Sequence, residues 1–533
     1  MVGVTGAAPS RRDTVGAMTV KARPLAAVAT VLALALSGCT LFGGDSEPEP
    51  PPQATSPSTP QAPPTGSENL AEFYGQQLSW RKCAGGQCAD LTVPLSYEDP
   101  GGDTIKVKVL KVPASRKKGR LGSLVVNPGG PGGSGVEYAQ AADFIVGKPV
   151  RQRYDIVGFD PRGVGRSAPI NCLDDRQLDS FLGTDPTPDS DAEEKAFAGT
   201  AKSFADACKT NAGPLLGHVS TVDAAKDMDI LRAALGDPKL NYLGKSYGTY
   251  LGATYADLFP SLVGQFVLDG VVPPDLTSAE VNEGQAAGFE LATRAWAKDC
   301  VEEGGCPLGD SVDAVMRGLR DFLKGLDARP IPSGDPHVPQ LTEGWGSLGI
   351  AAAMYDQGSW AILTDAIRRA VKDGDGRDLM ALANTYADRT ETGRYTGNIM
   401  EVIYAVNCLD KPDSPDVSVY EKQAQEFTAS APTWGPFLAW SSLPCGYWPI
   451  KSDNEPKKVA AEGSGPIVVV GTTRDPATPY EWSVRLNDQL ANSSLITFDG
   501  DGHTAYTRSN ECVDDAIDSY YVKKAVPLDG LKC

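Results

Sequence analysis

A strand, a sharp turn and a helix are encoded, in this order, by Asn241-Tyr242-Leu243-Gly244-Lys245-Ser246-Tyr247-Gly248-Thr249-Tyr250-Leu251-Gly252. The turn is a Gly-x-Ser-x-Gly motif centred on Ser246, and a side chain at Gly244 or Gly248 would clash with its close neighbours. Such a turn exposes the serine hydroxyl at the N-terminus of the following helix. The motif alone is common by chance, but the strand-turn-helix context makes Ser246 a specific candidate for a nucleophile.

This turn belongs to a longer alternation of strand-like and helix-like segments. Short apolar runs of the buried, parallel kind occur at 124–126, 154–159, 240–243, 266–268, 467–470 and 495–498. Two earlier runs, 91–95 and 105–110, have the pattern of antiparallel opening strands. Helical stretches separate the later strands, for example the one that begins near Thr221. The alternation predicts an α/β fold with a doubly wound, mostly parallel sheet.

The segment 274–465 interrupts the alternation with mainly helical sequence that contains tryptophan and proline. An insertion at one edge of the sheet is the simplest account. The predicted sheet domain is therefore split into a first part, residues 70–273, and a C-terminal part, residues 466–533.

Residues 1–38 have the pattern of an export signal. Basic residues precede an apolar run, 25–36, which is too short to span a bilayer. The run ends at Leu36-Ser37-Gly38-Cys39, which resembles a bacterial lipoprotein signal in which Cys39 is lipidated; an ordinary cleaved signal peptide is the alternative, and Met18 is an alternative start. Residues 39–69 are rich in Pro, Ser and Thr and predict an extended tether. We therefore expect an extracytoplasmic protein, anchored to the cell membrane by lipid or released from it.

The cysteines favour the same location. Of the 11 cysteines, Cys39 is assigned to lipid, which leaves an even number that favours disulfides in an exported protein. No CxxC spacing suggests a zinc site. Because short loops cost least to close, each cysteine is expected to pair with its nearest partner. The expected pairs are Cys83 with Cys88, Cys172 with Cys208, Cys300 with Cys306, Cys408 with Cys445, and Cys512 with Cys533.

The composition excludes several classes of function. A formal charge of -19, from Lys+Arg 49 against Asp+Glu 68 in 533 residues, argues against a nucleic-acid partner. The only histidines, His218, His337 and His503, are too few for a histidine-rich metal site. The glycine-rich loop at 127–135 lacks the Gly-Lys-Ser/Thr ending of a nucleotide-binding P-loop. We therefore expect neither a metal nor a cofactor.

A serine hydroxyl needs a base and an orienting carboxylate to become nucleophilic. His503 is the only histidine after the insertion and follows the last apolar run, while Asp475 follows the run before it. Both are expected beside Ser246 at the carboxyl edge of the sheet, in the order Ser, Asp, His. Asp269 and Asp499 are the rivals to Asp475, and a solvent-facing histidine with a turn-capping aspartate is the alternative.

The loop after the run at 124–126 reads Asn127-Pro128-Gly129-Gly130-Pro131-Gly132-Gly133-Ser134-Gly135. With so few side chains, its backbone N–H groups can approach a carbonyl oxygen as that oxygen becomes negative. Gly129 or Gly130 is the expected donor, and the N–H of Tyr247 is the second one.

Together these motifs resemble a known family. The loop 127–135, Phe159-Asp160-Pro161-Arg162-Gly163-Val164-Gly165-Arg166-Ser167, the elbow 244–248, Leu268-Asp269-Gly270-Val271, and 471–479 with Gly502-His503 resemble the α/β-hydrolase peptidases of the secreted tripeptidyl aminopeptidase group, relatives of prolyl iminopeptidases. The resemblance implies an α/β-hydrolase fold in which the insertion forms a cap. It also implies that Ser246 is the nucleophile, Asp475 the orienter, and His503 the general base and acid.

The implied function is the removal of short, tripeptide-type units from free N-termini of peptides by acyl transfer. Such an enzyme must bind a free ammonium, and the candidate carboxylates on the cap are Glu280, Glu283, Asp356 and Glu401, each of which has a solvated surface acid as its alternative. Trp345, Trp360, Trp434 and Trp440 are candidates either for the pocket or for core packing. Two other functions remain open: a carboxylic ester hydrolase with the same triad, and a surface lipoprotein that binds without catalysis.

Overall fold

The computed structural model describes residues 62–533, except residues 117 and 453. The predicted signal, Cys39 and the predicted tether up to residue 61 lie outside the described residues. None of the helices within the described range combines the length and the apolar character that a membrane crossing requires.

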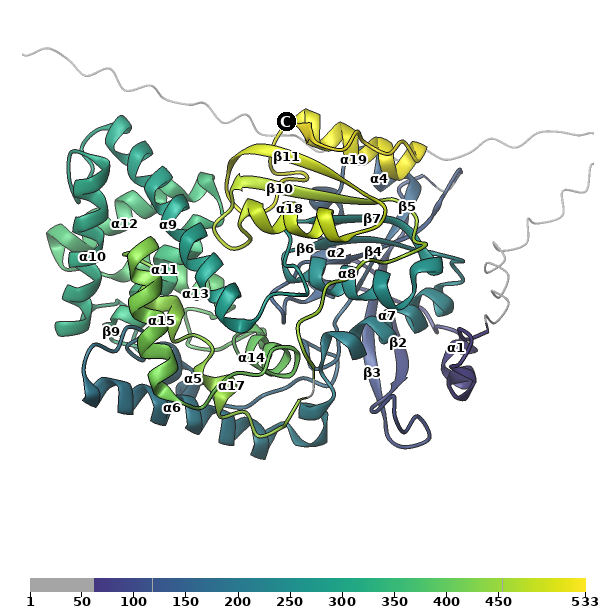
Figure 1. Ribbon diagram of the computed structural model, residues 1–533, viewed down its shortest axis with the longest axis horizontal. Coiled ribbons are helices and arrows are strands. Elements are labelled where there is room, and N and C mark those ends of the chain that lie inside the picture. Colours follow the sequence, from purple (N-terminus) through teal and green to yellow (C-terminus); the bar gives the residue numbers. More distant parts are fainter. Residues whose placement is uncertain (1–61, 117, 453) are drawn as a thin grey trace, which may run out of the picture. The chain divides into compact units, whose positions relative to one another are not determined.

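A ten-stranded sheet runs through the described chain in the order β1-β2-β3-β5-β4-β6-β7-β10-β11-β12 (Figure 1). The first strands pair antiparallel up to the contact of β3 with β5, and every pairing from β5 to β12 is parallel. The doubly wound, mostly parallel sheet and its antiparallel opening strands are thereby confirmed. The strands are β1 (Arg81–Cys83), β2 (Gly86–Pro94), β3 (Thr104–Val112), β4 (Gly122–Asn127), β5 (Tyr154–Phe159), β6 (Leu240–Lys245), β7 (Val263–Asp269), β10 (Ile467–Arg474), β11 (Ser493–Asp501) and β12 (Leu531–Lys532).

Helices cover both faces of this sheet, which explains the continuous apolar runs of its central strands. Along β10, Val469 packs in the apolar cluster that contains α7 and α8, whereas its neighbours Val468 and Val470 pack in the cluster that contains α2, α4 and α19. This alternation is the two-residue period of a strand. The helices and short turns of the sheet domain are η1 (Glu68–Leu70), α1 (Ala71–Tyr74), α2 (Gly135–Gln140), α3 (Ala142–Ile145), α4 (Lys148–Arg153), η2 (Gly213–Gly217), α7 (Thr221–Leu235), α8 (Tyr247–Leu258), η3 (Pro260–Leu262), α18 (Tyr480–Gln489) and α19 (Glu511–Lys523).

A mainly helical segment lies between β7 and β10, beside the carboxyl edge of the sheet (Figure 1). It has an apolar cluster of its own, built around Trp296, Trp345 and Trp434. Its elements are α9 (Ser278–Glu303), α10 (Val312–Ala328), β8 (Ile331–Pro332), β9 (Gln340–Leu341), α11 (Glu343–Met354), η4 (Gln357–Ser359), α12 (Trp360–Asp373), α13 (Arg377–Tyr386), α14 (Ile399–Asp410), α15 (Val417–Ser430), α16 (Gly435–Ala439) and α17 (Leu443–Gly446). We refer to this segment as the cap.

A second segment also packs on the cap, although the sequence analysis assigned it to the sheet domain. It carries α5 (Asp175–Leu182) and α6 (Asp191–Asn211), which precede α7 in the chain. Ala201 of α6 shares an apolar cluster with Tyr420 and Trp440 of the cap. The buried guanidinium of Arg389 forms ion pairs with Asp179 of α5 and with Asp335. Helical periodicity shows that such a segment has an apolar face, but it does not identify the surface that covers that face.

The structure contains five disulfides within its described residues, and they join the same nearest partners that the loop-length argument gives. Cys172–Cys208 ties the chain before α5 to α6, and Cys408–Cys445 ties α14 to α17. Each of these two disulfides therefore closes one segment on itself, while the apolar cluster of Trp440 and the ion pair of Arg389 with Asp179 join the segment to the cap.

The loop after β5 is anchored by a fully buried ion pair. Arg162 donates through Nε and Nη2 to the two carboxylate oxygens of Asp227 in α7, at 2.7 Å each. Its remaining hydrogen bonds go to the carbonyl oxygens of Pro94, Leu95 and His218. A single side chain thus joins β2, α7 and the loop before α7.

Replacing Arg162 by methionine is expected to lower the free energy of unfolding by about 3–5 kcal/mol, because Asp227 would stay buried without its partner. Urea denaturation of the purified protein measures this loss. Arg166→Met is the matched control in the same loop: its ion pair with Glu137 has side chains that are 58% and 60% exposed. We expect the control to change the free energy by at most about 1 kcal/mol, and equal losses in the two variants would contradict the role of Arg162.

Candidate active site

Ser246 stands on a strained turn between β6 and α8. It is not a glycine, yet its φ is 56°, and its N–H donates to the carbonyl oxygen of Asp269 at 3.0 Å. The flanking glycines are required by close approach: a Cβ on Gly244 would lie 2.3 Å from the carbonyl oxygen of Gly248. These contacts give the nucleophile elbow that the sequence analysis expected, with the serine at the first turn of a helix.

Asp475 and His503 meet at the ends of β10 and β11. The Nδ1 atom of His503 lies 2.8 Å and 3.0 Å from the two carboxylate oxygens of Asp475. Asp475 is buried and also accepts the N–H groups of Ala477, Thr478 and Thr504. A carboxylate held this firmly fixes the imidazole ring with Nδ1 toward the aspartate and Nε2 turned away from it.

The Nε2 atom of His503 is buried and has no hydrogen-bond partner among the described residues, Ser246 included. The ring lies near the elbow, because a Cβ on Gly270 would be 3.3 Å from His503 Cε1, and Gly270 directly follows the residue whose carbonyl accepts the Ser246 N–H. Such hydrogen bonds are often long or poorly aligned before substrate binds. An unpartnered ring nitrogen at this edge is suited to exchange a proton with the hydroxyl.

The rival carboxylates have other partners. Asp269 is buried, accepts the N–H groups of Ala505 and Tyr506, and lies 3.6 Å from the Nζ of Lys245. Burial lowers the pKa of Lys245, and Asp269 opposes that shift. Lys245 also donates to the carbonyl oxygen of Tyr506, so this pair joins the elbow to the loop that carries His503.

Asp499 is the other rival, and it faces solvent. It pairs with Arg474 at 2.8 Å and accepts a hydrogen bond from Thr473. Of the three carboxylates, Asp475 is the one whose oxygens lie within hydrogen-bond distance of the His503 ring.

The glycine-rich loop offers one backbone donor to the site. The Gly129 N–H is already bonded to the side-chain oxygen of Asn127 at 2.9 Å. Gly130 is exposed and lines the same cavity as Ser246 and Tyr247. Within the described residues, neither the Gly130 N–H nor the Tyr247 N–H has a hydrogen-bond partner. Of the two glycines left open by the sequence, Gly130 therefore fits an oxyanion donor, together with Tyr247.

Ser246 opens into a cavity of about 290 Å³ between the sheet domain and the cap. Its walls are mostly aromatic and aliphatic, and among the residues that the structure describes Lys411 alone brings a full charge to them. No carboxylate lines it in the part of the chain that the structure describes. Besides Ser246, the residues that line it include Tyr250, Ser278, Asn282, Gln285, Tyr355, Asn407, Trp434, Ser441 and Cys445.

None of the four acids proposed for amine binding lines this cavity. Glu280 instead caps α9, because its side chain accepts from Thr277, and it pairs with Arg485 at 3.7 Å. Glu283 is exposed on the same helix. Helical spacing placed both on α9, but the face of α9 toward the cavity carries Ser278, Asn282 and Gln285.

The other two acids are also committed elsewhere. Asp356 caps the η4 turn and pairs with Arg508 at 3.4 Å. Glu401 is buried and accepts the N–H groups of Cys172 and Leu173; burial raises the pKa of Glu401, while these N–H groups lower it. Of the four tryptophans, only Trp434 lines the Ser246 cavity.

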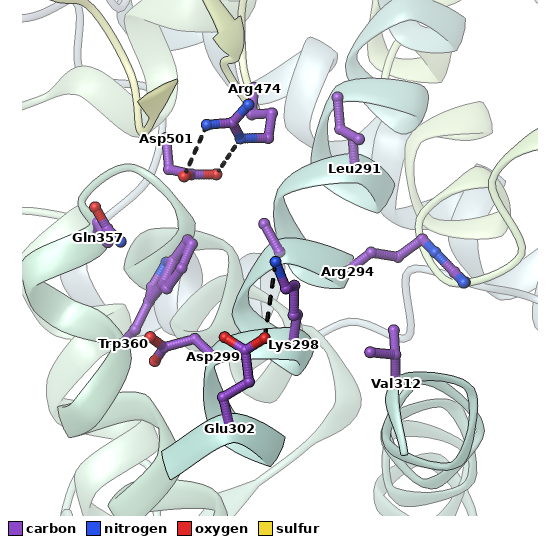
Figure 2. A pocket seen from close by; sticks show the side chains of 11 residues that line it. Leu291, Arg294, Lys298, Asp299, Glu302, Val312, Gln357, Trp360, Arg474 and Asp501 are labelled. Atoms are coloured by element: carbon purple, nitrogen blue, oxygen red, sulfur yellow. Dashed lines mark hydrogen bonds and ion pairs between the residues drawn. The ribbon is translucent and has the colours of Figure 1, made fainter. Parts of the chain in front are cut away.

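A larger cavity of about 580 Å³ lies along the outer part of α9 (Figure 2). Most of its charged groups are already paired: Arg474 with Asp501, Lys298 with Glu302, and Arg294 with Asp313. It shares no lining residue with the Ser246 cavity. The smaller cavity is therefore the candidate substrate site.

Three residues of the site were missed by the sequence analysis. The ring of Tyr355 lies edge-on to His503, with centroids 5.2 Å apart, and its carbonyl oxygen accepts the His503 N–H. Lys411 follows the last residue of α14. Neither position carries a motif that could have identified it. Lys245 did carry a signal, since it is a charged residue at the end of a buried strand.

Known proteins resemble the chain along nearly its whole length. Residues 431–533 match the family described as TAP-like protein. "Serine protease Hip1" of Mycobacterium tuberculosis (strain ATCC 25618 / H37Rv) is 38% identical over 549 residues, which cover 98% of this chain and 99% of the relative. "Carboxylesterase B" of the same species (strain CDC 1551 / Oshkosh) is 36% identical, with 96% and 98% covered. "Tripeptidyl aminopeptidase" of Streptomyces lividans is 34% identical, with 86% of each chain covered.

Replacing Asp269 by asparagine is expected to slow covalent labelling of Ser246 by a fluorophosphonate at least about tenfold, because Lys245 and the loop of His503 lose their common partner. Intact-protein mass spectrometry over time measures the rate, and thermal midpoints recorded in parallel separate local from global effects. Asp499→Asn, at a side chain that is 77% exposed, is the matched control and should stay within about twofold of the unmodified protein. Equal labelling rates in both variants would remove the positioning role of Asp269.

Proposed function

This chain belongs to the TAP-like family of α/β hydrolases, and from that premise we propose that it is an exported serine exopeptidase that removes short, tripeptide-type units from free N-termini of peptides. The coarser assignment, a serine hydrolase of the peptidase kind, follows from the relatives named serine protease and tripeptidyl aminopeptidase. The finer assignment is supported chiefly by one observation. A histidine fixed by Asp475, with its Nε2 unpartnered, stands at the edge where Ser246 opens into a capped cavity.

The proposed chemistry is acyl transfer. Ser246 Oγ attacks the scissile carbonyl carbon while His503 Nε2 takes its proton, and Asp475 stabilises the resulting imidazolium. The N–H groups of Gly130 and Tyr247 bind the oxygen as it becomes negative. The imidazolium then gives the proton to the leaving amine, and the amine departs. His503 Nε2 then takes a proton from water while the water oxygen attacks the acyl carbonyl carbon. The bond to Ser246 Oγ breaks, the imidazolium returns its proton to Oγ, and the acid leaves.

The cap supports short substrates, because it covers the cavity into which Ser246 opens. A free ammonium would have to be held by neutral oxygen atoms, since no carboxylate lines the cavity within the described residues. Side-chain oxygens are available on Asn282, Gln285 and Ser441. This way of binding replaces the four cap acids that the sequence suggested.

The lack of a carboxylate among the described residues of the cavity wall also favours a second candidate function, a carboxylic ester hydrolase. Its substrates need no ammonium site, and a relative that covers nearly the whole chain is named carboxylesterase B. The triad and the oxyanion donors would serve an ester as well as an amide. A binding lipoprotein without catalysis has no such support, because a purely binding role needs no nucleophile elbow.

We also propose that the protein acts outside the cytoplasm, anchored through a lipid on Cys39. Five disulfides support an oxidising compartment.

A tripeptide with a free N-terminus, joined to a chromogenic amine, should be hydrolysed at least about tenfold faster in kcat/KM than its N-acetylated form, because acetylation removes the ammonium. A simple ester of the same chromophore provides the comparison. Ser246→Ala is the control and should hydrolyse none of them. Equal rates for the free and acetylated peptides would overturn the exopeptidase assignment, and hydrolysis of the ester alone would favour the esterase.

Replacing Cys39 by serine should move the protein from the membrane fraction to the medium or the soluble fraction, since one thiol carries the anchor. Immunoblots of the fractions from cells that make either form measure the distribution. The protein with Cys83 and Cys88 both replaced by serine keeps Cys39 and should remain in the membrane fraction. An unchanged distribution of Cys39→Ser would contradict lipid anchoring at this residue.

A further inference from the structure

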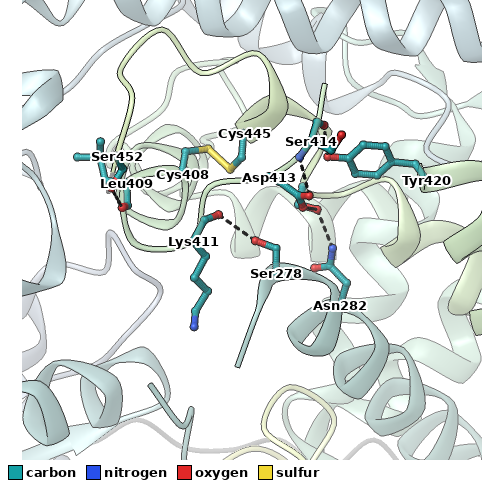
Figure 3. The surroundings of a disulfide bond; sticks show 11 residues. Ser278, Asn282, Cys408, Leu409, Lys411, Asp413, Ser414, Tyr420, Cys445 and Ser452 are labelled. Carbon is teal, nitrogen blue, oxygen red and sulfur yellow. Dashed lines mark hydrogen bonds between the residues drawn. A yellow bond between two sulfur atoms is a disulfide. The ribbon is translucent and has the colours of Figure 1, made fainter. Parts of the chain in front are cut away.

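Lys411 places a buried positive charge in the wall of the Ser246 cavity. It follows α14 directly, near the Cys408–Cys445 disulfide, and only 5% of the residue is exposed. Its backbone oxygen accepts from Ser278, and its side chain extends away from the disulfide (Figure 3). The ammonium lies 4.9 Å from the ring centroid of Tyr250. Tyr250 is four residues after Ser246 on α8, about 6 Å along the helix axis.

This ammonium has few partners. It donates one hydrogen bond, to the carbonyl oxygen of Leu276. Among the described residues, no carboxylate lies within ion-pair distance of it. An ammonium has three N–H donors, so two remain beyond the bond to Leu276.

The nearest carboxylates are committed to other groups. Asp410 accepts the backbone N–H and the hydroxyl of Thr221. Asp275 forms an ion pair with Arg485 at 2.9 Å, and Glu280 pairs with the same guanidinium. Arg485 in turn opposes the attraction of these acids for Lys411.

Burial without a counter-ion is costly for an ammonium. Burial lowers the pKa of Lys411 to about 8. Asp410, Asp275 and Glu280, although none of them forms an ion pair with it, counteract this shift. The side chain is therefore mostly charged at neutral pH. The Lys411 ammonium is already buried away from water in the free protein. An anion that enters the cavity therefore gains a charge-assisted hydrogen bond from Lys411 and supplies the counter-ion that this ammonium lacks.

We propose that Lys411 binds a carboxylate of the substrate inside the Ser246 cavity, and that the enzyme thereby selects peptides that carry an acidic side chain or a free C-terminal carboxylate near the cleaved bond. Asn407, four residues before Lys411 on α14, lines the same cavity and supplies a neutral amide donor for the carboxylate. The inference rests on the proposed function in one respect, that the substrate is a peptide cleaved at Ser246.

Pairs of peptides that differ by one carboxylate test the proposal. One set has glutamate or glutamine at each position around the cleaved bond, and the other ends in a free acid or an amide. In the unmodified protein, kcat/KM should be about 10- to 100-fold higher for the carboxylate member of at least one pair. The pair that shows the preference identifies which carboxylate is bound. Equal values, within about twofold in every pair, would overturn the proposal without any variant.

Two variants separate charge from structure. Lys411→Gln keeps a donor for the Leu276 oxygen and Lys411→Met removes it, but both remove the charge and should bring the ratio within each pair to about one. Lys422→Met is the matched control, at a side chain that is 76% exposed on α15, and should keep the original ratio. Fluorophosphonate labelling of Ser246 verifies that each variant is folded. A ratio that persists in Lys411→Gln would show that the preference has another origin.

Failure of the peptidase assignment would be distinguishable from failure of this inference. If esters alone are hydrolysed, kcat/KM is compared instead for two nitrophenyl esters of equal length, one of a dicarboxylic monoanion and one of a neutral acid. A preference for the monoanion that disappears in Lys411→Gln would support the inference, and no preference would overturn it.

Discussion

Four neighbouring strands, β6, β7, β10 and β11, run parallel and therefore end at the same edge of the sheet. Their register pairs Lys245 with Asp269, and Asp269 with Val470, so the loops after β6 and β7 begin at the same level, while β10 and β11 continue to the pair Arg474 and Asp501. The residues that directly follow β6, β7 and β10 are Ser246, Gly270 and Asp475, and His503 lies two residues after the end of β11. A shift of one residue in any strand would turn its side chains to the other face.

The buried carboxylate of Asp269 strengthens this arrangement. It lies between the ammonium of Lys245, one residue before the nucleophile, and the backbone of the loop that carries His503. The two carboxylates at this edge thus have separate tasks. Asp475 fixes the ring and Asp269 fixes the loop, and each is satisfied by several donors, as a buried charge requires.

The cap determines what can reach this edge. Its helices pack against α6 in the apolar cluster around Trp440, and the disulfides of Cys172 and Cys408 brace the two segments internally. The cavity beneath the cap is largely apolar, and within the described part of the chain its one positive charge is that of Lys411. The ammonium of Lys411 attracts an anion into this cavity, so the substrate's own charges matter as much as the reactivity of Ser246. The cap thus determines selectivity, and the sheet determines reactivity.

Much of the sheet domain could be read from local sequence. Strand runs buried on both faces, the glycines that flank Ser246, and the order of Ser246, Asp475 and His503 all follow from short-range rules of sterics and chain direction. The pairing of cysteines also followed, because near partners close the shortest loops.

The sequence alone could not choose between Gly129 and Gly130, since the choice depends on a hydrogen bond from Gly129 to Asn127. Nor could it tell that Glu280 and Glu401 face away from the cavity, or that Lys411 faces it. Those outcomes depend on how helices pack against segments that are distant in the chain. An amphipathic pattern identifies the buried face of a helix, but it does not identify the segment that packs against that face. Local chemistry therefore determined the reacting groups, and only tertiary packing decided which charges surround them.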